Sequence, residues 1–66
     1  MELDIRNYKI EIREELLNNF MSIRFPNEKR GSNYWCEWMT RFISGYPHRW
    51  MDDQSQKVFI ELINKL

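Results

Sequence analysis

The stretch NYWCEWMTRFIS, residues 33–44, has apolar side chains around most of the surface of one predicted helix. Successive helical residues are turned by about 100 degrees, and on that spacing the apolar residues cover about 200 degrees, about twice the stripe that a surface helix buries. These residues are Tyr34, Trp35, Cys36, Trp38, Met39, Phe42 and Ile43. A helix with so wide an apolar surface can contact two neighbours at once, which favours an all-α domain of three helices.

The residues on either side set the limits of this helix. Ser32 or Asn33 can accept hydrogen bonds from the free amides at its start, and Gly45, with Pro47 two residues later, is the usual stop signal. Before the helix, residues 25–32 combine Pro, Asn, Gly and charged side chains, which is typical of an exposed loop. The second helix is therefore predicted at residues 33–44.

The stretch before this loop predicts a first helix at residues 4–24, with Asp4 as its N-cap. Apolar residues recur there every three or four positions. They form a main face of Ile5, Tyr8, Ile12, Leu16, Phe20 and Ile23, and a second stripe of Ile10, Leu17 and Met21. Tyr8, Ile10 and Ile12 also alternate as in a β-strand, so a strand at residues 8–12 is the competing interpretation.

The C-terminal stretch predicts a third helix at residues 53–66, with a clear apolar face that includes Phe59 and Leu62. Asp52 or Asp53 can cap its start, because a carboxylate accepts hydrogen bonds from the free amides there. The three faces together predict the centre of the core. Its residues are Trp35, Phe42, Phe59, Leu62, Ile63, Leu16, Phe20 and Ile12.

The length of 66 residues predicts one domain, residues 1–66, that needs dense packing or self-association to be stable. The single Cys36 cannot form an internal disulfide, and with one histidine, His48, the chain has too few soft ligands for a closed zinc site. Three Trp, three Tyr and four Phe favour dense packing. A homodimer through the first two helices would cover the surplus apolar surface.

The search for catalytic chemistry finds only Cys36 and His48 as a nucleophile and a base, without an oxyanion-hole or orienting motif. We therefore expect a protein that is not an enzyme and that uses no cofactor or metal. The chain has no apolar run of about 18 residues, and its acidic start lacks the features of a signal peptide. A cytoplasmic location without membrane contact is the expectation.

Charge is balanced overall, with ten basic and ten acidic residues, but it is unevenly distributed. Residues 22–50 have five Lys and Arg against two Glu, a net charge of plus three, whereas both ends are net negative. Tyr34, Trp35 and Trp38 lie in the same segment and could stack on bases. A small RNA- or DNA-binding protein that uses residues 22–50 is therefore the alternative function.

The favoured function is an adaptor or inhibitor that docks on a larger protein and blocks or redirects it, because a nearly neutral, aromatic-rich domain without catalytic groups acts by occupying surface. Trp and Arg are enriched at protein interfaces. The predicted contact residues are Arg30, Trp38, Arg41, Arg49 and Trp50. Small single-domain products of phages and mobile elements include many inhibitors of host defence systems or host enzymes, and we expect this protein to belong to that class.

Overall fold

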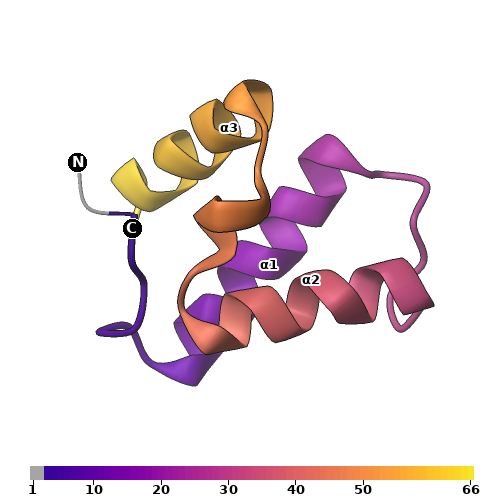
Figure 1. Ribbon diagram of the computed structural model, residues 1–66, viewed down its shortest axis with the longest axis horizontal. Helices are drawn as coiled ribbons and strands as arrows, with labels where there is room; N and C mark the ends of the chain where they lie inside the picture. The colour runs from indigo at the N-terminus through magenta and orange to yellow at the C-terminus, as the bar shows by residue number, and fades with distance from the viewer. Residues whose placement is uncertain (1–2) are drawn as a thin grey trace.

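The computed structural model describes residues 3–66, which form three α-helices and one short 3₁₀ helix around one core (Figure 1). The predicted domain also includes residues 1 and 2, which lie outside the described part. The elements are α1 (Ile10–Arg24), α2 (Asn33–Ser44), η1 (Pro47–Trp50) and α3 (Asp53–Asn64). The predicted all-α, compact three-helix fold is confirmed, and residues 3–66 contain no strand.

Side chains and a glycine set the ends of α2 and α3 as the sequence predicts. The Ser32 hydroxyl accepts a hydrogen bond from the Trp35 amide at 3.2 Å, and the Asp52 carboxylate accepts one from the Ser55 amide at 2.8 Å. Gly45 ends α2 with a φ of 94°, a left-handed conformation that glycine adopts without a steric penalty. Of the proposed caps, Ser32 and Asp52 are therefore the ones that the fold uses.

The start of α1 differs from the prediction, because the helix begins at Ile10 and not at Asp4. The Asp4 carboxylate accepts a hydrogen bond from the Arg6 amide at 2.9 Å, and the Ile5 amide donates to the Gly45 carbonyl at 3.1 Å. Residues 3–9 therefore turn back along the end of α2, and Ile5 enters the core. At the other end of the chain, α3 stops at Asn64, two residues before the predicted end.

The core lies between the three helices, because α1 packs against both α2 and α3. Its buried apolar residues are Ile5, Leu16, Leu17, Phe20, Met21, Trp35, Trp38, Phe42, Met51, Phe59 and Leu62. Six of the eight residues predicted for its centre are among them, whereas Ile12 and Ile63 are partly buried at its edge. Leu17 and Met21, from the second stripe of the first helix, are buried as well, and Ile23 from the main face is exposed.

Aromatic rings join the helices at the middle of the core. The centre of the Phe20 ring on α1 lies 5.1 Å from the centre of the Trp38 ring and 5.5 Å from the centre of the Phe42 ring, both on α2. Phe42 meets Phe59 of α3 edge to face at 5.6 Å. Rings at these separations bury large apolar areas and add a favourable ring–ring interaction. The wide apolar surface of α2 is therefore used mainly inside the domain.

Candidate functional site

An exposed tryptophan stands next to an arginine on one side of α2. The Arg41 guanidinium lies 4.8 Å from the centre of the Trp38 ring and 5.3 Å from the centre of the Trp50 ring. Glu37, Thr40, Arg41 and Trp50 line an open hollow of about 410 Å³ there, which we call the Trp50 surface. Trp50 is 52% exposed, so a large aromatic side chain in this hollow is available to a partner.

The 3₁₀ helix η1 brings Trp50 to this position. Pro47 occupies its first turn, and the Met51 amide closes its end by donating to the His48 carbonyl at 3.3 Å. Pro47 and Met51 are both buried, which anchors η1 at either end. The segment packs against α2 and holds Trp50 beside Arg41.

Of the five predicted contact residues, Trp38, Arg41 and Trp50 are brought together. Trp38, which the sequence predicts as a contact residue, is only 3% exposed, so its ring is not accessible to a partner in this structure. Its ring is enclosed by core aromatic residues such as Phe20 and is covered by Arg41. It therefore supports Arg41 from below, and Arg41 and Trp50 form the accessible part of the site.

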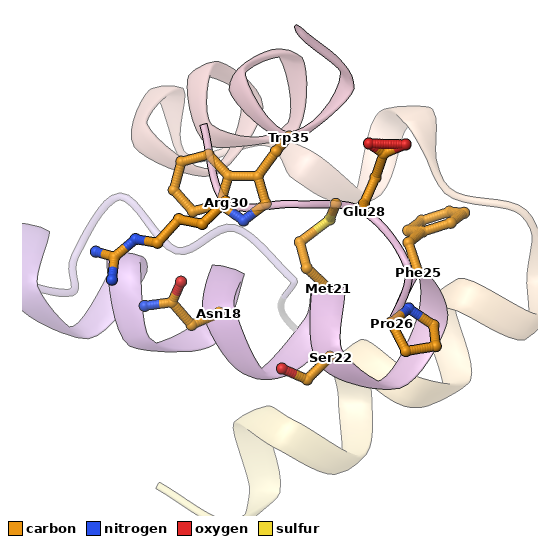
Figure 2. A pocket seen from close by; sticks show the side chains of 8 residues that line it. All are labelled: Asn18, Met21, Ser22, Phe25, Pro26, Glu28, Arg30 and Trp35. Atoms are coloured by element: carbon orange, nitrogen blue, oxygen red, sulfur yellow. The ribbon is translucent and has the colours of Figure 1, made fainter. Parts of the chain in front are cut away.

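Arg49 and Arg30 lie apart from this trio. Arg49 is exposed on η1 next to Trp50, but its guanidinium lies 4.6 Å from the centre of the Tyr46 ring. Arg30 belongs to the loop before α2, where its guanidinium lies 5.8 Å from the centre of the Trp35 ring. It borders a second, smaller hollow between the end of α1 and residues 25–32, which we call the loop hollow (Figure 2).

Sequence reasoning missed several residues of the two hollows. Glu37 and Thr40 line the Trp50 surface, and the Glu37 carboxylate lies 4.0 Å from the Arg41 guanidinium. The spacing of four residues on a predicted helix was a usable signal for this pair. Asn18 and Ser22 line the loop hollow. Nothing in the spacing of polar residues on α1 distinguishes these two from its other polar positions.

Several cations of the basic segment are held by contacts within the domain. Arg24 donates to the Ser55 hydroxyl at 2.9 Å, and its guanidinium lies 3.8 Å from the Asp52 carboxylate. Donation by the Ser55 amide holds the pKa of Asp52 below its ordinary value of 3.8, with a smaller contribution from the charge of Arg24. Arg41 is stacked between two indoles. Exposed cations in this segment that lack an ion pair among residues 3–66 are Lys29, Arg30 and Arg49.

The stacking rings proposed for RNA or DNA binding are largely covered. Trp35 is 8% exposed and Trp38 less, because both belong to the core. Of the three proposed rings, Tyr34 alone is exposed. Bases stack on open ring faces, so of these three rings Tyr34 offers the exposed surface for stacking, and the alternative function stays a prediction.

Cys36 and His48, the two residues considered for chemistry, differ in their surroundings, because the buried Nδ1 of His48 makes no hydrogen bond within residues 3–66. The Cys36 thiol donates to the Gly31 carbonyl at 3.6 Å. In the described part of the chain, no three His, Cys, Asp or Glu side chains come together as metal ligands would. No helix formed by residues 3–66 combines the length and the apolar character needed to cross a membrane.

Comparison with known proteins finds no protein-family model, no curated protein and no solved structure that matches this chain. The structure itself shows a small three-helix domain with two hollows on its surface.

Proposed function

We propose that this protein is a non-enzymatic adaptor or inhibitor that docks on a larger protein through the Trp50 surface. The supporting observation is the exposed indole of Trp50 held beside Arg41, which itself rests on the buried ring of Trp38. Tryptophan and arginine are the side chains that most often dominate binding energy at interfaces. Because Arg41 is fixed on Trp38 before binding, little side-chain freedom is lost when a partner covers it.

The proposal assigns contact roles to Trp50 and Arg41, with Arg49 at the edge. They act together by blocking or redirecting the partner, because a side-chain surface of this kind acts by covering part of the protein that it contacts. We also propose that the protein is cytoplasmic. We place it among the inhibitors from phages and mobile elements that act on host defence systems or host enzymes. Homodimer formation through α1 and α2 is not needed for this mode of action.

The test is quantitative affinity capture of the tagged protein from its native cytoplasm, with mass spectrometry of what co-purifies. Trp50→Ala is compared with wild type and with Ile23→Ala, which removes an apolar side chain of similar exposure (55%) on α1. We expect one stoichiometric protein that survives nuclease treatment, is lost with Trp50→Ala and is retained with Ile23→Ala. Loss of all partners on nuclease treatment would instead indicate RNA or DNA binding.

A further inference from the structure

The loop hollow, of about 220 Å³, has an apolar floor and a polar rim. The apolar lining includes Met21, Trp35 and Phe25, and the first two are buried in the core. Ligand pockets for drug-sized molecules or cofactors are usually about 300–1,000 Å³. The loop hollow is smaller, so it has room for a group about the size of one amino-acid residue and not for a nucleotide.

The loop that forms the rim is held by its own hydrogen bonds. The Glu28 amide donates to the Phe25 carbonyl and the Ser32 amide to the Lys29 carbonyl, both at 3.0 Å. The Ser32 hydroxyl also donates to the Glu28 carboxylate at 2.8 Å. Because these bonds exist without a partner, the rim is preorganised and binding requires little further ordering.

Three side chains of the rim have hydrogen-bonding groups that make no polar contact within residues 3–66. Arg30 makes no ion pair within residues 3–66, and the side chains of Asn18 and Ser22 make no hydrogen bond there. In the view of Figure 2, the Arg30 guanidinium and the Asn18 amide lie on the same side of the hollow, and the Glu28 carboxylate lies on the other side. One side of the rim is therefore suited to an anion, whereas Glu28 repels a second negative charge on the opposite side.

We propose that the loop hollow binds the C-terminal residue of a partner protein chain, an apolar residue whose free carboxylate meets Arg30. The hollow has room for one residue, so the apolar group and the carboxylate must belong to the same residue. A chain end with an apolar side chain meets this condition, whereas an Asp or Glu side chain lacks the apolar part. Arg30 and Asn18 donate to the carboxylate, and the side chain rests on Met21 and Trp35.

The test is a nuclear magnetic resonance titration of the isotope-labelled protein with an acetylated Gly-Gly-Phe peptide. We expect the indole N–H signal of Trp35 and the side-chain amide signals of Asn18 to shift. The same peptide with a C-terminal amide should bind about tenfold more weakly or worse, because it lacks the charge that Arg30 recognises. Equal affinity of the acid and the amide, or no shift at either residue, would overturn the proposal.

Two variants separate the Arg30 charge from general basicity. Arg30→Gln should weaken binding of the peptide with the free carboxylate about tenfold. Lys29→Gln removes the neighbouring exposed cation, which lies outside the hollow, and should leave the affinity for this peptide unchanged. A free aromatic acid such as phenylacetate that binds more tightly than the peptide would contradict a chain-end ligand. Trp50→Ala should leave peptide affinity unchanged, so this site and the proposed docking through Trp50 can fail independently.

Discussion

The side chain of Arg13 fastens the segment before α1 to the end of α2. Its guanidinium donates to the Ile43 carbonyl at 2.6 Å, in the last turn of α2, where carbonyls lack helical partners. A positive charge is also favourable at that end of a helix dipole. The other carbonyls that accept from Arg13 belong to Ile5, Arg6 and Tyr8. One partly buried cation thus satisfies the backbone of two segments far apart in the sequence.

We predict that Arg13→Met lowers the free energy of unfolding by about 2 kcal/mol or more, because it keeps the aliphatic length but leaves several partly buried carbonyls without a donor. Urea unfolding followed by circular dichroism measures the change. The control is Lys57→Met, an exposed position on α3, where we expect a change within about 0.5 kcal/mol. Equal effects of the two variants would contradict the role assigned to Arg13.

The cap of α3 gives a pH dependence whose sign can be stated. Hydrogen bonds from Ser55 hold the pKa of Asp52 below its ordinary value of 3.8, so the folded state favours the ionised carboxylate. This contribution is fully present above about pH 4 and is lost as the pH falls through the lowered pKa. We predict that Asp52→Asn, which keeps a capping oxygen but cannot ionise, shows a weaker loss of stability between pH 5 and about pH 2. Thermal unfolding across that range measures the difference, and parallel curves for both proteins would refute it.

At the level of elements, the end of α2 depends on Gly45 for two reasons. Its left-handed φ of 94° is unfavourable for other residues, and a Cβ there would overlap Arg6 Cγ in the segment that turns back over the helix. Gly31, with a φ of 91°, has the same backbone requirement, but a Cβ there would meet open space. The two glycines therefore form a matched pair that separates backbone strain from packing.

We predict that Gly31→Ala lowers the free energy of unfolding by about 1 kcal/mol, because alanine pays only the penalty of the left-handed backbone conformation there. Gly45→Ala should cost at least about 1 kcal/mol more, because the N-terminal segment must also move away from α2. Chemical denaturation of both variants gives the comparison. Similar values for the two would show that residues 3–9 adapt without cost.

The limits of α2 and α3 could be predicted because local side chains decide them, as Ser32, Gly45 and Asp52 show. The start of α1 could not, because it depends on contacts distant in sequence. Asp4 and Ile5 fit the helical pattern of apolar residues. A turn is favoured there, however, because the Ile5 amide donates a hydrogen bond to the Gly45 carbonyl and the Arg13 guanidinium donates to the Ile5 carbonyl. Periodicity in one segment contains no information about such partners.

The candidate site was predictable in part for the same reason. Trp38 and Arg41 are three residues apart on one helix, so their contact follows from helical spacing. Trp50 reaches Arg41 only through the geometry of η1, which the sequence does not specify. The packing of α1 decides which tryptophan is covered. It buries Trp38 in the core and leaves Trp50 exposed.

For the whole molecule, the small size limits how much stability a substitution can remove before the domain unfolds. Natural domains are stable by roughly 0.05–0.15 kcal/mol per residue, so a chain of 66 residues has roughly 3–10 kcal/mol available. Truncating a buried Trp to Ala costs about 3–5 kcal/mol. One core tryptophan therefore accounts for much of the total stability, whereas an exposed one contributes little.

This contrast predicts opposite outcomes for the two tryptophans that flank Arg41. Trp38→Ala removes a ring packed 5.1 Å from Phe20 and leaves a cavity in the centre, so we expect a largely unfolded protein. Trp50→Ala should keep the wild-type far-ultraviolet circular dichroism spectrum and lose less than about 1 kcal/mol, because half of its surface is already in water. If Trp50→Ala also unfolded the domain, Trp50 would be a structural residue and its exposed indole could no longer be ascribed to partner binding. A folded Trp50→Ala protein that fails to retain the captured partner would separate binding from stability in a single variant.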